Sequence, residues 1–135
     1  MKFAQYGTII VVVHAIANGL HGLAHIKIPV ALSVLQSSFV AIVIFLAPII
    51  AAVLLWTQFY RIGSWLLLGS LAGSLLFGIY NHFIVISPDH VSQVSFQGWG
   101  ILFQVTAILI LILDGFGCWI IGQALKTKAP QQQEV

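Results

Sequence analysis

The chain is poor in charge and has almost no cysteine. Charged residues make up only 6% of its 135 residues, with five basic and three acidic side chains. So few basic residues argue against nucleic acid as a partner, because its recognition needs a basic patch. Cys118 is the single cysteine. This excludes an intrachain disulfide and any zinc or iron–sulfur site made only of cysteine.

Several catalytic signatures are missing as well. The sequence has no nucleophile elbow and no glycine-rich phosphate loop after a strand, which are marks of common hydrolases and nucleotide-binding enzymes. It has one HxxxH pair and none of the adjacent histidine pairs found in the histidine boxes of membrane desaturases and hydroxylases. Diiron chemistry of that type is therefore disfavoured.

Apolar sequence is what the chain has in abundance. Hydrophobic residues make up 60% of it, and its mean hydropathy is +1.07, values outside the range of soluble domains. A membrane-spanning helix needs about 20 apolar residues. Four stretches qualify, at residues 6–25, 31–56, 62–86 and 97–125. We predict an all-α integral membrane four-helix bundle over residues 1–125 and a disordered tail over residues 126–135.

Two features of the first half need interpretation. Lys2 and the apolar run after it resemble a secretory signal peptide, but His14 and Asn18 interrupt the run and no small-residue cleavage site follows. We therefore interpret the run as the first span. Pro48 lies inside the second span, which predicts a kink there or a carbonyl near Ile44 that is hydrogen-bonded from elsewhere.

The basic residues predict the orientation in the membrane. Lys2, Arg61, Lys126 and Lys128 flank one side of the spans, and Lys27 alone flanks the other. The positive-inside rule then places both termini in the cytoplasm of a multi-pass cell membrane protein. With this orientation, every histidine except His14 falls in the outer half of the bundle.

A polar stripe on the first span is the strongest functional signal. His14, Asn18, His21 and His25 are spaced by four, three and four residues, which puts them within a stripe about 60° wide on one helix face. Polar groups at bilayer depth are costly and usually face protein or a cavity. The pair His21 and His25 can also bind one metal ion, because residues i and i+4 share a face.

A second polar cluster follows the third span. It consists of Asn81, His82, Asp89 and His90, at the same predicted depth as the HxxxH pair. We predict His21, His25 and His82 as ligands of a cofactor, with His90 or Asp89 as further candidates and Asn18 and Asn81 as hydrogen-bonding neighbours. Imidazole and carboxylate ligands suit Zn, Cu or Fe, and two facing imidazoles with nearby glycines also suit one haem b.

Asp114 is an isolated acid inside the fourth span. An ionised carboxylate at this depth needs a partner, and His14 is the ionisable group at a similar predicted depth. The two residues are predicted to pair, as a proton path or as support for a ligand histidine.

Together these patterns favour a metal or haem b site near the outer face that serves electron transfer or a small redox reaction. Two alternatives stay open. The polar stripe could line a proton-coupled transport or permeation path without metal, which in so small a bundle implies a homo-oligomer. It could also dock on a partner membrane subunit. In all three cases the lipid bilayer is the main partner of the protein.

Overall fold

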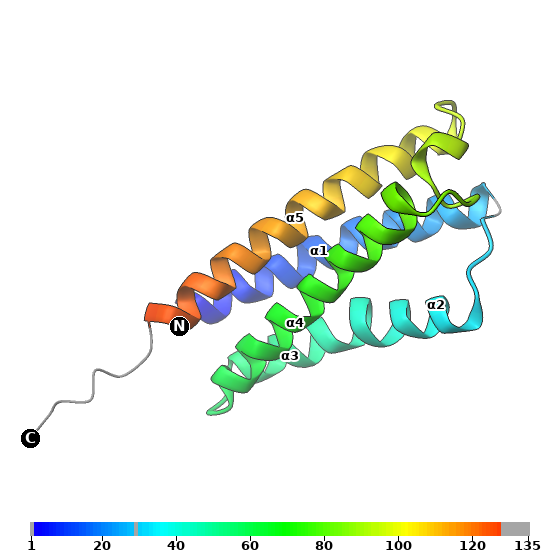
Figure 1. Ribbon diagram of the computed structural model, residues 1–135. Helices are drawn as coiled ribbons and strands as arrows, with labels where there is room; N and C mark the ends of the chain where they lie inside the picture. The colour runs from blue at the N-terminus through cyan, green and yellow to red at the C-terminus, as the bar shows by residue number, and fades with distance from the viewer. Residues whose placement is uncertain (1, 29, 128–135) are drawn as a thin grey trace, which may run out of the picture.

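The computed structural model describes residues 2–28 and 30–127, which form helices and connecting segments without strands (Figure 1). Four helical rods are long and apolar enough to cross a membrane: Lys2–Lys27, Val34–Leu55, Tyr60–Ile84 and Trp99–Thr127. The predicted fold class is therefore confirmed, with ends that differ from the predicted spans by a few residues. Most of the predicted tail, residues 128–135, lies outside the described residues.

Two of the rods are continuous α-helices and two contain a wider π-helical turn. The first rod is α1 (Lys2–Lys27) and the last is α5 (Trp99–Thr127). The second rod joins α2 (Val34–Phe39), the π-helix η1 (Val40–Leu46) and α3 (Ala47–Leu55). The third joins α4 (Tyr60–Ile79) to the π-helix η2 (Tyr80–Ile84). A short 3₁₀ turn, η3 (Val91–Gln93), lies in the connection to α5.

The bundle has two distinct ends. The N-terminus and the last turn of α5 lie together at one end (Figure 1), which we call the terminal end. At the opposite end α1 and η2 finish and α5 begins; we call this the histidine end. α2 reaches the histidine end without a single buried residue, and its Val34 and Leu35 are 86% and 80% exposed. These side chains suit contact with lipid.

An apolar core fills the terminal half of the bundle. Its buried members come from α1, α3, α4 and α5: Ala4, Val11, Ala51, Leu55, Leu67, Leu71 and Ile121. The helices approach closely here. A Cβ added to Gly63 would lie 3.0 Å from the carbonyl oxygen of Ala51, so glycine is what allows α3 and α4 to meet. The histidine half also has buried apolar side chains, such as Phe103 and Ile110, but it holds all the buried histidines and carboxylates of the described residues.

Pro48 shapes the second rod. Proline has no N–H, so the carbonyl of Ile44 lacks its usual helical donor. In η1 the hydrogen bonds join residues five apart, as the bond from the Ala47 N–H to the Ile42 carbonyl shows. In this register residue 48 would donate to the Val43 carbonyl, so Pro48 leaves that carbonyl without a donor as well. Side chains from other helices replace both donors: Ser70 Oγ donates to Val43 over 2.5 Å, and His14 Nε2 donates to Ile44 over 2.9 Å. The prediction of a carbonyl bonded from elsewhere is confirmed.

Candidate metal centre

Three of the predicted ligand residues meet at the histidine end. His21 and His25 come from the last turns of α1, and His82 comes from η2 on the third rod. One ring nitrogen from each lies within 4.8 Å of the other two. His21 and His82 are buried, and His25 is partly buried. The π-helical turn matters here, because π-turns re-aim side chains and recur at functional sites.

The hydrogen bonds of His21 determine which of its nitrogens carries a proton. Its Nδ1 lies 2.9 Å from the hydroxyl oxygen of Thr106 on α5. That hydroxyl already donates its one proton to the carbonyl of Leu102 over 2.5 Å. The Thr106 oxygen must therefore accept from His21 Nδ1. A neutral imidazole then has a bare lone pair on Nε2.

The same reasoning applies to His82. Its Nδ1 lies 2.9 Å from the backbone carbonyl oxygen of Asp89, and a carbonyl only accepts. His82 therefore donates from Nδ1 and keeps a lone pair on Nε2. The two Nε2 atoms of His21 and His82 are 3.2 Å apart. Two lone pairs at this distance repel each other unless a proton or a metal ion lies between them.

His25 and the Asp89 carboxylate extend this arrangement. His25 Nδ1 lies 3.4 Å from the carbonyl oxygen of Val30, and its Nε2 lies 3.2 Å from Asp89 Oδ1. The same Oδ1 is 3.2 Å from His82 Nδ1, but that N–H is directed to the backbone carbonyl. Asp89 is buried, and neither carboxylate oxygen has a hydrogen-bond partner among the described residues. A buried carboxylate without donors is costly, and a nearby cation would satisfy it.

The spacing suits a metal ion. Imidazole nitrogens bind zinc at about 2.0–2.1 Å, so two ligands of a tetrahedral ion lie about 3.3 Å apart. His21 and His82 already have this spacing, and the nitrogen of His25 is within reach. In metal sites the second ring nitrogen of each histidine usually donates to a carbonyl, a carboxylate or water, which holds the ring in orientation. His82 and His25 have backbone carbonyls in this position, and His21 has a hydroxyl.

Two residues of α5 support the centre and were not foreseen from the sequence. Phe103 is fully buried, and its ring lies 4.8 Å from His21, 5.1 Å from His25 and 5.4 Å from His82 between centroids. Thr106 fixes the tautomer of His21. Phe103 could have been found by counting eleven residues back from Asp114, because that interval returns to the same helix face. Nothing in the sequence pattern distinguishes Thr106 as a functional residue.

His14 and Asp114 form a second buried polar group, which lies deeper in the bundle, farther from the histidine end. The two are 2% and 0% exposed, and His14 Nδ1 lies 2.7 Å from Asp114 Oδ1. Since His14 Nε2 donates to the Ile44 carbonyl, a single shared proton lies between Nδ1 and Oδ1. The pair is then neutral overall, which explains how it tolerates full burial. The predicted pairing is present in the structure.

The other candidate residues have partners outside the histidine group. Asn18 donates to the His14 carbonyl over 3.0 Å. Asn81 accepts from Gln36 over 2.9 Å and so ties α2 to η2. His90 begins η3, where its Nδ1 accepts from the backbone N–H of Ser92 over 3.1 Å. The structure therefore brings together His21, His25 and His82 beside Asp89, and leaves His90 on the surface turn.

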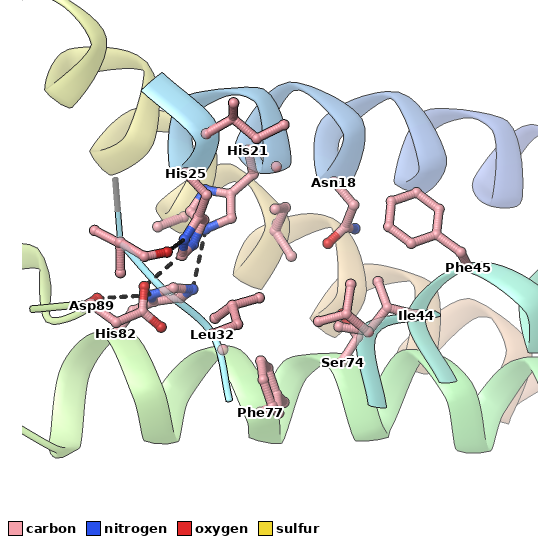
Figure 2. A pocket seen from close by; sticks show the side chains of 17 residues that line it. Asn18, His21, His25, Leu32, Ile44, Phe45, Ser74, Phe77, His82 and Asp89 are labelled. Carbon is pink, nitrogen blue, oxygen red and sulfur yellow. Dashed lines mark hydrogen bonds and ion pairs between the residues drawn. The ribbon is translucent and has the colours of Figure 1, made fainter. Parts of the chain in front are cut away.

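A cavity of about 280 Å³ adjoins the histidines. Figure 2 shows His21, His25, His82 and Asp89 gathered at one end of it, with Ser74 and Ile44 at the other and Asn18 opposite Ser74 in this view. The walls are otherwise apolar, with the aromatic rings of Phe45 and Phe77 among them. The three histidines thus border a space large enough for a small apolar molecule.

Comparison with protein-family models, with curated proteins and with solved structures finds no match for this chain. The function is therefore inferred from the site alone.

Proposed function

We propose that the protein is an integral membrane metalloprotein that holds one transition metal ion on His21, His25 and His82, and that this ion serves a small redox reaction in the adjoining cavity. The observation that carries the proposal is the pair of Nε2 lone pairs at 3.2 Å. Each belongs to a histidine whose Nδ1 proton is committed to an acceptor. A cation between them turns this repulsion into coordination.

The ligand set narrows the metal to a small group. Three imidazoles beside a carboxylate favour Fe, Cu or Zn over Mg or Ca, which prefer oxygen ligands. Three protein ligands leave a coordination position for water or substrate, as in catalytic zinc sites. Fe or Cu would provide redox chemistry, whereas Zn would provide a Lewis acid. Asp89 would neutralise part of the charge of the ion.

A metal ion accounts for the geometry better than haem b. Bis-histidine haem places its two imidazoles on opposite faces of a porphyrin. Here the coordinating nitrogens of His21 and His82 are in direct contact range at 3.2 Å, and the rings of His21 and His25 also meet edge to face with centroids 4.8 Å apart. The three rings converge on one point, which suits an ion rather than a macrocycle.

A metal centre also accounts for the burial pattern better than a permeation path. From the histidine end the ionisable groups continue inward as far as His14 and Asp114. Beyond them the buried side chains of the described residues are mainly apolar, such as Val11, Leu71 and Ile121. The buried hydroxyls there, of Ser64 and Ser70, donate to backbone carbonyls. A proton or solute pathway would need polar groups or water through that half as well.

The test is metal binding by the purified protein in lipid nanodiscs, without a histidine tag. We expect one equivalent of Fe, Cu or Zn by elemental analysis, or after reconstitution of the metal-free protein. Co²⁺ loading should give the visible bands of a four- or five-coordinate ion. His21→Ala with His82→Ala is the loss-of-site variant, and His90→Ala is the matched control. Failure of the wild-type protein to hold any of these ions would overturn the proposal, and binding of Zn without Fe or Cu would overturn its redox part.

A further inference from the structure

We propose that the cavity beside the histidines binds a bilayer-soluble 1,4-quinone, with one quinone oxygen at the metal centre and the other at Ser74. This inference rests on the proposed metal centre and names the class of molecule that it would meet. Three observations support it: an unpaired hydroxyl, the composition of the cavity walls and the lipid-facing surroundings of the cavity.

The first observation is a buried hydroxyl without a partner. Ser74 is 1% exposed and lines the cavity. Its Oγ has no hydrogen-bond partner among the described residues, although most buried hydroxyls in proteins have one. The neighbouring Ser70 donates to a carbonyl of η1, so the helix does not force this state. The Ser74 hydroxyl is a free donor at the end of the cavity away from the histidines.

The second observation is the separation of polar groups within the cavity. Ser74 and His82 are eight residues apart on the third rod, about 12 Å along the axis. Apart from Asn18, the walls between them are apolar, with Ile44, Phe45, Phe77, Gly78, Ala107 and Ile110 among the lining residues. A ligand that satisfies both ends therefore needs a polar atom at each end of an apolar body. A 1,4-quinone has this form, because its two carbonyl oxygens lie on opposite edges of a ring.

The third observation is the position of the cavity relative to lipid. One part of its wall comes from α1 and an adjoining part from Val30, Leu32 and η1, while the third rod and α5 form the rest. The residues near that junction are strongly exposed, with Ile26 at 76% and Val34 at 86%. In a membrane these side chains contact acyl chains. A molecule that enters here comes from the bilayer, which favours a lipid-soluble ligand over a water-soluble one.

The test uses Zn²⁺-loaded protein in nanodiscs, because zinc keeps the site occupied without redox turnover. The ligand is a tritium-labelled 2-decyl-1,4-benzoquinone, compared with a 2-decylcyclohexanone that has a single oxygen. Binding is measured by equilibrium filtration against empty nanodiscs, so partition into lipid is subtracted. Wild-type protein should bind the quinone more tightly than the ketone.

Three variants locate the ligand. Ser74→Ala should weaken quinone binding about two- to tenfold, the value of one hydrogen bond, and leave ketone binding unchanged. Gly22→Leu should abolish binding of both, because Gly22 lines the cavity and a Cβ there meets nothing within 4 Å. Gly19→Leu is the matched control, since Gly19 is exposed and is not part of the cavity wall.

The outcomes separate the two proposals. Zinc bound at one equivalent without quinone binding above empty nanodiscs would overturn the quinone site and leave the metal centre standing. Quinone binding that Gly22→Leu does not reduce would overturn the quinone site as well. Absence of zinc from the wild-type protein would overturn the metal centre, and this inference with it.

Discussion

His14 replaces the amide proton that Pro48 lacks. Its Nε2 donates over 2.9 Å to the Ile44 carbonyl, which in an unbroken helix would bond to the N–H of residue 48. A proline in one rod is thus coupled to a histidine in another. The bond also decides the state of His14, because Nε2 must carry a proton and only Nδ1 is left to share one with Asp114.

The protein should therefore lose more stability when His14 alone is replaced than when His14 and Asp114 are replaced together. His14→Leu leaves both Asp114 and the Ile44 carbonyl without a donor, and breaking a buried pair in this way costs about 3–5 kcal/mol. The double variant His14→Leu with Asp114→Leu removes the orphaned carboxylate and should be more stable than His14→Leu alone. The measurement is reversible unfolding in mixed detergent micelles. A double variant less stable than the single one would show that the pair is not coupled.

Removal of a ligand histidine should strongly weaken metal binding. His21→Ala or His82→Ala each takes away one of the two nitrogens at 3.2 Å, and we expect the metal affinity to fall at least about 100-fold, since even supporting residues cost about 10–100-fold. His90→Ala should retain the ion, because His90 only caps η3. Metal titration of all three variants checks this. Full metal content in both His21→Ala and His82→Ala would rule out the ligand assignment.

Thr106 offers a test of the tautomer argument. Thr106→Val keeps the shape of the side chain and removes the acceptor of His21 Nδ1. We expect about 10-fold weaker metal binding, because the ring is no longer held with Nε2 toward the site. Thr8→Val is the control, as Thr8 also bonds to a carbonyl of its own helix but lies in the terminal half. Equal affinity in Thr106→Val and wild type would contradict the assigned proton on Nδ1.

The sequence predicts the four spans well because length and hydropathy alone decide whether a segment can cross a bilayer. It also predicts the meeting of His21, His25 and His82, since depth in the membrane aligns residues that are distant in the chain. The histidine geometry is not predictable in the same way. It depends on the π-turn at η2, on the backbone carbonyl of Asp89 and on the hydroxyl of Thr106, and none of these has a signature in the pattern of residue types.

The shared proton of the buried pair should matter for redox chemistry and not for metal binding. Asp114→Asn keeps the size of the side chain but removes the carboxylate that shares a proton with His14 Nδ1. We expect unchanged metal content, because the pair does not contact the three histidines. If the pair takes up a proton when the ion is reduced, the midpoint potential of the wild type falls by about 59 mV per pH unit, the tenfold interval for one electron. In Asp114→Asn this slope should flatten.

Spectroelectrochemistry of the Fe- or Cu-loaded protein at several pH values measures the slope, with Gln123→Ala on the exposed end of α5 as the control. An unchanged slope in Asp114→Asn would remove the pair from any proton-linked step and leave it a role in packing.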